Sequence, residues 1–117
     1  DVVTLHVPLL DETRGMICKK TLAWMKPTAI LINAARGEIV NEEDICDALE
    51  KQQLGGYGVD AFAHEPPWDS RLLQMKQVVM TPHTGAYTHE AIHKMSQYSA
   101  QSVIAFARGE AVPNRVV

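Results

Sequence analysis

GVDAFAHEPP, residues 58–67, is the stretch that decides the fold of this 117-residue chain. It continues a short apolar run over residues 57–62, which two glycines precede as turn signals. An apolar run of this length, bounded in this way, predicts a buried strand rather than a helix. Pro66 then favours extended geometry at Glu65, so we expect the strand to present that carboxylate from a stiff loop at its carboxyl end.

Three other segments also predict strands: residues 2–7, 29–35 and 78–81. The near-continuous apolar character of 29–35 is typical of a parallel strand that is covered on both faces. An irregular segment is expected around Trp68. With helices in the intervals, this order predicts an α/β fold with a parallel sheet, in which ligands bind at the carboxyl ends of the strands.

Helical periods occupy three further segments. The first helix is expected over residues 18–25, and its apolar face consists of Ile17, Leu22 and Met25. The second should start at the N-cap Asn41, with three acidic residues in its first turn, and end with Gly55 as its cap. Its period is carried by Ile45, Ala48, Leu49 and Gln52.

The third helix should run from the cap Thr88 to about Arg108, closed by Gly109 and Pro113. One face would carry Ile92, Met95, Ser99, Val103 and Phe106.

The composition indicates a single soluble, cytoplasmic domain. The net charge of -3 argues against a nucleic-acid surface, and no apolar run approaches the roughly 20 residues of a membrane span. Cys18 and Cys46 are widely spaced, which favours two free thiols in a reducing compartment. Because the chain opens directly on a strand without an initiator Met, we expect the middle of a longer polypeptide or a shortened chain.

Three strand ends carry complementary ionisable groups: Arg36, Glu65 and His83. The planar guanidinium of arginine binds a carboxylate through two hydrogen bonds, and histidine can give or take a proton near neutral pH. A carboxylate beside the imidazole favours its protonated form. Such a trio suits a carbonyl group that lies next to a carboxylate, although three such residues also occur at loop positions by chance.

Four motifs resemble the D-isomer-specific 2-hydroxyacid dehydrogenases, in order and roughly in spacing. They are His6-Val7-Pro8-Leu9, Asn33-Ala34-Ala35-Arg36-Gly37, Gly58 to Phe62 leading to Glu65-Pro66, and Thr81-Pro82-His83-Thr84-Gly85-Ala86. The resemblance covers nearly the whole chain. It is closest to the phosphoglycerate-dehydrogenase-like branch, through residues 85–88 and 90–92.

The resemblance implies a catalytic trio of Arg36, Glu65 and His83. It also implies that NAD contacts the strand ends, with Asp60 at the nicotinamide carboxamide and the remaining contacts from His6, Pro8, Leu9, Ala34, Ala35, Arg36, His83, Gly85 and Ala86. In the implied reaction a 2-keto acid accepts a hydride from NADH, Arg36 binds its carboxylate, and His83 protonates the oxygen. Formate dehydrogenases share the scaffold, but Glu65 favours hydroxyacid chemistry, because their members carry Gln there.

The chain lacks the glycine-rich turn and the ribose-reading acidic residue of a complete dinucleotide site. We therefore expect the second half of a Rossmann-type NAD-binding domain, of about four strands with flanking helices, in which 88–117 leads back towards a substrate domain. Residues 2–7 would form a hydrophobic edge strand. The isolated chain should bind NAD weakly and not turn over, NADP stays possible, and the full-length form should be a homodimer.

Two other functions remain open from the sequence. His89-Glu90-Ala91-Ile92-His93 spells the H-E-x-x-H pattern of zinc hydrolases on a predicted helix, although the first histidine lies in the first turn. A helix start exposed to solvent explains the same residues without a metal. The third possibility is a non-catalytic, truncated fragment on the same scaffold. The presence of all three ionisable groups argues against a degenerated homologue.

Overall fold

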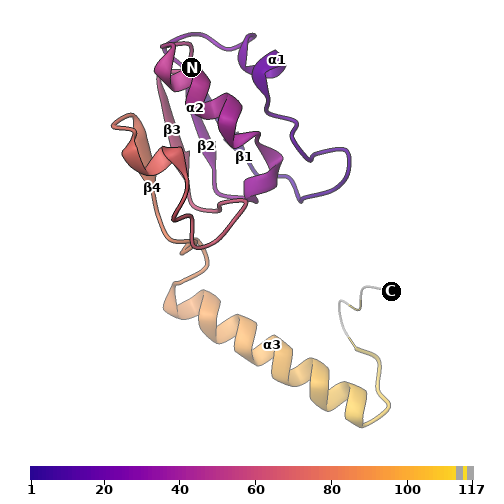
Figure 1. Ribbon diagram of the computed structural model, residues 1–117. Helices are drawn as coiled ribbons and strands as arrows, with labels where there is room; N and C mark the ends of the chain where they lie inside the picture. The colour runs from indigo at the N-terminus through magenta and orange to yellow at the C-terminus, as the bar shows by residue number, and fades with distance from the viewer. Residues whose placement is uncertain (113–114, 116–117) are drawn as a thin grey trace. The chain divides into compact units, whose positions relative to one another are not determined.

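A computed structural model describes residues 1–112 and Arg115 of the chain. It divides into two compact units, Asp1–Thr84 and Gly85–Val117, and each is considered by itself. Figure 1 shows the sheet and its helices in the first unit and one long helix in the second. The predicted closing role of Pro113 lies outside the described residues.

The first unit is built on a four-stranded parallel sheet in the order β1-β2-β3-β4. The strands are β1 (Val2–Leu5), β2 (Ile30–Asn33), β3 (Gly56–Val59) and β4 (Val78–Met80). The predicted parallel α/β sheet is confirmed, but every strand is shorter than predicted. Residues 6–7, 34–35 and 60–62 lie beyond the ladder, at the carboxyl end of the sheet. These are the residues available to build a site.

The core lies between one face of the sheet and α2 (Glu42–Glu50), which Figure 1 shows along that face. As predicted, Asn41 caps this helix, because its side chain accepts a hydrogen bond from the backbone N–H of Asp44 at 3.1 Å. The core joins buried side chains of α2 to those of β2 and β3: Ile45, Cys46, Ala48, Leu49, Leu31, Tyr57 and Val59.

The end of α2 differs from the prediction. The helix stops at Glu50 with Lys51 as its C-cap, and Gln52 lies outside it in the left-handed region at φ 55°. Gly55 is therefore not the cap. A Cβ atom on Gly55 would lie 2.8 Å from the carbonyl group of Thr28, so glycine is needed there for close backbone packing.

α1 is also shorter than predicted, at Lys19–Leu22 rather than 18–25. Cys18 takes the N-cap position instead of lying inside the helix. The predicted apolar face holds, because Ile17 and Leu22 lie in the core and Met25 packs against it.

Two short 3-10 helices were not anticipated. η1 (Gly37–Ile39) follows β2 directly, and η2 (Arg71–Gln74) lies just after the segment expected to be irregular. Arg71 ties η2 to α2 through acidic side chains of successive turns, including a 2.8 Å hydrogen bond to Glu50. These contacts join residues more than 20 positions apart, so local sequence pattern does not show them.

The opposite face of the sheet is not covered as the sequence predicted. Leu31 is fully buried, but its neighbours Ile30 and Ile32 are 44% and 36% exposed. At the side of the sheet, β1 is an edge strand with Val2 and Val3 exposed. The predicted hydrophobic edge strand is confirmed.

The second unit contains α3 (His89–Ala107), which begins at the predicted cap. The Thr88 hydroxyl accepts a hydrogen bond from the backbone N–H of Ala91 at 3.1 Å, and Gly109 follows the C-cap Arg108 in the left-handed region at φ 70°. The apolar residues predicted for one face, such as Val103 and Phe106, are exposed. Within the described residues, no helix has both the length and the hydrophobicity to cross a bilayer.

Candidate active site

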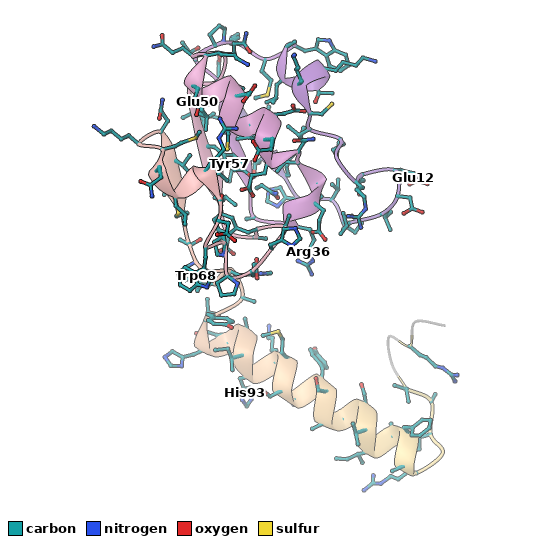
Figure 2. The ribbon with its side chains drawn as sticks, viewed as in Figure 1. Glu12, Arg36, Glu50, Tyr57, Trp68 and His93 are labelled. Atoms are coloured by element: carbon teal, nitrogen blue, oxygen red, sulfur yellow. The ribbon has the colours of Figure 1, made fainter. Side chains whose placement is uncertain are left out.

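The carboxyl ends of the parallel strands meet at one edge of the first unit, here called the rim. It is made of the residues that follow β1, β2, β3 and β4: 6–9, 34–36, 60–65 and 81–84. Figure 2 shows Arg36 and Trp68 at this end of the sheet and Glu50 towards the opposite end. The topology therefore brings the predicted trio to one edge.

Glu65 and His83 form a direct pair across two neighbouring strand ends. Nδ1 of His83 lies 3.0 Å from both carboxylate oxygens of Glu65. The backbone N–H of Phe62 also donates to Glu65 Oε1, at 2.9 Å, which helps to fix the carboxylate. With Nδ1 facing a carboxylate, the hydrogen-bond network assigns a proton to that nitrogen and leaves Nε2 for a ligand.

The same contacts set the charge of Glu65. The hydrogen bond with His83, followed by that of the Phe62 N–H, lowers the pKa of the Glu65 carboxyl from its usual value. The carboxylate is thus ionised at neutral pH and can stabilise a positive imidazole. An acid–base group and its orienting anion are both in place.

The turn that carries His83 is held by Asp60. The backbone of His83 is in the left-handed region at φ 53°, which residues other than glycine rarely adopt. Asp60 bonds on both sides of it: Oδ1 accepts from the hydroxyl of Thr81 and from the backbone N–H of Thr84, the latter at 2.9 Å. Asp60 is largely buried, so this clamp fixes the turn that presents the imidazole.

Arg36 is placed by its backbone rather than by its side chain. Its side chain is exposed, and Nη1 donates to the carbonyl of the preceding Ala35 at 2.7 Å. The next residue, Gly37, lies against the peptide that joins Phe62 to Ala63, where a Cβ atom would come within 2.1 Å. Only glycine allows this approach, which brings the turn after Arg36 onto the loop that carries Glu65.

Two of the hollows at the rim contain residues of the predicted site. One, of about 500 Å³, is lined by His6, Val7, Pro8, Leu9, Ala35 and Arg36, at the ends of β1 and β2. The other, of about 480 Å³, contains Glu65 and His83 and is walled by mainly apolar side chains that include Trp68 and Met80. The first fits the expected NAD contacts, because five residues predicted for the cofactor line a single concave site at the carboxyl ends of parallel strands.

A sequence model of the D-isomer specific 2-hydroxyacid dehydrogenase NAD binding domain matches residues 1–85. The chain belongs to this family. The match covers the whole sheet and both the acid–base pair and Arg36, and it supports NAD as the cofactor.

Relatives within the dehydrogenase family agree with this assignment. The chain is 46% identical over 116 residues to glyoxylate reductase of Thermococcus litoralis, covering 99% of this chain and 35% of that protein. It is 50% identical over 91 residues to D-3-phosphoglycerate dehydrogenase of Synechocystis sp., covering 78% of this chain and 16% of that protein. The chain thus spans about a third or less of the length of these relatives.

Solved structures of the same family share the fold. A D-lactate dehydrogenase with NAD+ from Lactobacillus jensenii matches all of this chain and 39% of its own, with a TM-score of 0.88 and 38% identity. A D-lactate dehydrogenase from Treponema pallidum matches all of this chain and 40% of its own, with a TM-score of 0.93 and 29% identity. The predicted Rossmann-type architecture is confirmed.

Several residues predicted to contact NAD do not line the hollow that contains Glu65 and His83. Ala34 is exposed on the rim, and the ring of His6 bonds its neighbour Thr4 at 2.9 Å. Gly85 and Ala86 belong to the second unit, so no position beside the rim is assigned to them. The nicotinamide contact of Asp60 stays a prediction.

The H-E-x-x-H pattern lies on α3. His89, Glu90 and His93 lie in its first turns, with His89 as the first helical residue. Across residues 1–112 and Arg115, no three His, Cys, Asp or Glu side chains are grouped closely enough to hold a metal ion.

Two residues that shape the rim, Thr81 and Asn33, stand in the motifs quoted above, but the sequence analysis assigned no role to either of them. Thr81 holds Asp60, and the side chain of Asn33 bonds the loop that leads to Arg36. Thr81 is the first residue of the motif that contains His83, which was the available signal for it. Asn33 sits at the end of an apolar strand, where a buried polar residue was the available signal.

Proposed function

We propose that the protein containing this chain interconverts a 2-keto acid and a D-2-hydroxy acid with NAD(H). The observation that carries the proposal is the Glu65–His83 pair, at 3.0 Å, on the rim that also carries Arg36. Membership of a family whose matching domain binds NAD supports the redox chemistry. NADH, when bound, supplies the hydride that reduces the keto carbon.

Each residue of the trio has a separate task in this proposal. Arg36 binds the substrate carboxylate through its planar guanidinium, which pairs with carboxylates through two parallel hydrogen bonds. His83 gives a proton from Nε2 to the keto oxygen as it becomes an alcohol, and takes that proton back in the oxidation direction. Glu65 holds Nδ1, so the imidazole keeps its orientation and its positive form is stabilised.

The substrate proposed first is glyoxylate or hydroxypyruvate, with 3-phosphohydroxypyruvate as the next choice. Proteins named glyoxylate reductase and D-3-phosphoglycerate dehydrogenase are 42–50% identical to this chain, which supports a small 2-keto acid. A formate dehydrogenase is disfavoured, because Glu65 lies at the orienting position of the pair.

Further features of the whole protein belong to the same proposal. We propose that residues 88–117 lead back towards a substrate domain and that the full-length form is a homodimer. A cytoplasmic location agrees with the free thiols of Cys18 and Cys46. Weak NAD binding by the isolated 117 residues stays a prediction, which calorimetric titration would check.

The test is a steady-state assay of the protein that contains this chain. Loss of NADH absorbance is followed with glyoxylate, hydroxypyruvate, 3-phosphohydroxypyruvate and pyruvate, and formate with NAD is tested in a separate reaction. The proposal expects turnover with at least one keto acid and a product of D configuration, or the achiral glycolate when glyoxylate is used. The proposal would be contradicted if no keto acid supported NADH oxidation, or if formate were the only substrate turned over.

A further inference from the structure

Asn33 is a polar side chain buried at the last position of β2. It is fully buried, although it follows the apolar strand residues Ile30, Leu31 and Ile32. A buried amide without hydrogen-bond partners would lower the free energy of unfolding by roughly 1–3 kcal/mol, so the partners of Asn33 matter for the fold. One contact of the amide is with the side chain of Tyr57 in the core, and two hydrogen bonds lead to the rim.

Both ends of the Asn33 amide bond the segment that carries Arg36. Nδ2 donates to the backbone carbonyl of Arg36 at 2.8 Å, and Oδ1 accepts from the backbone N–H of Ala35 at 3.1 Å. The Asn33 side chain thus supplies the hydrogen-bond partners of these two backbone groups, at the point where the ladder of the sheet ends. The amide fixes the backbone of residues 35 and 36 against the core.

Fixing that backbone matters because little else orients the guanidinium. Among the described residues, the only hydrogen bond of the Arg36 side chain goes to the carbonyl of its own neighbour Ala35. The direction of the side chain is therefore set by the Arg36 backbone, and the Arg36 carbonyl also accepts from the Ile39 N–H at 3.2 Å. Asn33 is the side chain that reaches this backbone from the core.

We propose that Asn33 is a positioning residue for substrate binding, which acts through the backbone of Arg36. This inference rests on the proposed function, in which Arg36 holds the carboxylate of a 2-keto acid. An amide is suited to the task because it supplies a donor and an acceptor at once. An ionised carboxylate of the same shape supplies acceptors alone, and an alanine supplies neither.

A purely structural role predicts a different outcome from a positioning role. If Asn33 only provides hydrogen bonds to the backbone after β2, its replacement lowers stability but leaves the affinity for the keto acid unchanged. If it positions Arg36, its replacement raises KM for the keto acid by roughly 10- to 100-fold, since small displacements of a binding group carry effects of that size. The kcat falls less, because His83 and Glu65 lie on other strand ends.

Asn33→Asp gives the sharpest test, because its effect depends on pH. The ionised carboxylate sets an oxygen against the Arg36 carbonyl and loses the donated bond, whereas the protonated carboxyl has a hydroxyl that donates again. The ratio of KM in the variant to KM in the wild type should therefore be large above neutrality and approach one in acid. Oxamate, an unreactive 2-keto-acid analogue, should lose affinity for the NADH-bound variant by the same factor in calorimetry.

Asn41→Asp is the matched control. Asn41 also accepts a backbone N–H through Oδ1, but it is exposed at the start of α2, where a carboxylate caps equally well. Its KM ratio should stay close to one at every pH. Both variants replace Asn by Asp. A rise in KM at residue 33 alone is therefore due to the contacts of Asn33 and not to the added charge.

The outcomes separate this inference from the proposed function. If the wild type reduces no 2-keto acid, the proposed function fails and the inference falls with it. If the wild type is active, and Asn33→Asp has the wild-type KM at every pH but a lower melting temperature, only the positioning role is overturned. Should Asn33→Asp not fold at neutral pH, Asn33→Ala must show a raised KM independent of pH, and a wild-type KM in that variant overturns the inference.

Discussion

The two sides of the rim are organised in different ways. At the ends of β3 and β4, the side chains of Asp60, Glu65 and His83 are linked to each other or to the chain by short hydrogen bonds. At the end of β2, Arg36 is exposed and bonded to its own neighbour. One side is assembled through side chains, and the other through a backbone fixed by Asn33 and Gly37.

The difference follows from what each side has to do. A proton donor must have a defined tautomer and orientation before the substrate arrives, so its partners belong to the protein. A guanidinium that binds a carboxylate has its strongest partner in the ligand. It therefore needs a backbone in the correct position and N–H donors that are available to the ligand. The substitutions below separate preorganised chemistry from ligand-dependent binding.

The largest effect is expected on the preorganised side, from His83→Ala. Removing the proton donor should lower kcat by about 10²- to 10⁴-fold, since general acid catalysis contributes that much. NADH binding, measured by calorimetry, should persist. His93→Ala, an exposed position on α3, is the control and should keep its kcat. A His83→Ala enzyme with wild-type turnover would remove the acid–base role.

Glu65→Gln should have the next largest effect. The amide can still accept the Phe62 N–H but no longer stabilises a positive imidazole, so kcat should fall by about 100-fold, the scale of losing one preorganised electrostatic contact. Steady-state kinetics would measure it. Glu110→Gln, which removes an exposed carboxylate from the second unit, should leave kcat unchanged. Equal kcat in both variants would contradict the role of Glu65.

Stability should separate the two sides in a further way. Asp60→Ala removes a largely buried carboxylate that accepts hydrogen bonds from Thr81 and Thr84, and it should lower the free energy of unfolding by about 2–3 kcal/mol. Arg36→Ala should change it by less than about 0.5 kcal/mol, because the side chain is exposed, while KM rises. Urea denaturation would compare them, and equal losses would show that Arg36 is also part of the folded framework.

The smallest effect concerns pH. The folded-state pKa of Glu65 is lowered, chiefly by His83, so the ionised carboxyl stabilises the fold above its unfolded-state pKa. This contribution is lost as the pH falls through the lower folded-state pKa. The stability difference between wild type and Glu65→Gln should therefore be present at neutral pH and vanish in acid. A difference that persists in acid would mean that the charge is not its source.

The sequence predicted the parts of the fold that follow local rules. The apolar run at 57–62, the cap at Asn41 and the cap at Thr88 each depend on neighbouring residues, and each element formed. Placement of the trio followed as well, because strands of one parallel sheet share the same carboxyl edge.

Most of the missed features depend on contacts between distant segments. Gly55 resembled a helix cap, but its need for glycine comes from the backbone of Thr28, and Gly37 is required by the peptide after Phe62. The role of Thr81 comes from a hydrogen bond to Asp60 at the end of another strand. A period or a turn signal describes neighbours along the chain, and the partners of Gly55, Gly37 and Thr81 are not neighbours. Asn33 differs, because it bonds Ala35 and Arg36, which follow it closely in the chain.

The central claim is that the two sides of the rim act on one substrate. The most direct measurement is an NMR titration of the NADH-bound protein with oxamate, following the guanidinium Nε–H of Arg36 and the imidazole of His83 together. The account predicts that both signals shift along one binding curve with a single dissociation constant. A shift of only one signal, or two different dissociation constants, would contradict it.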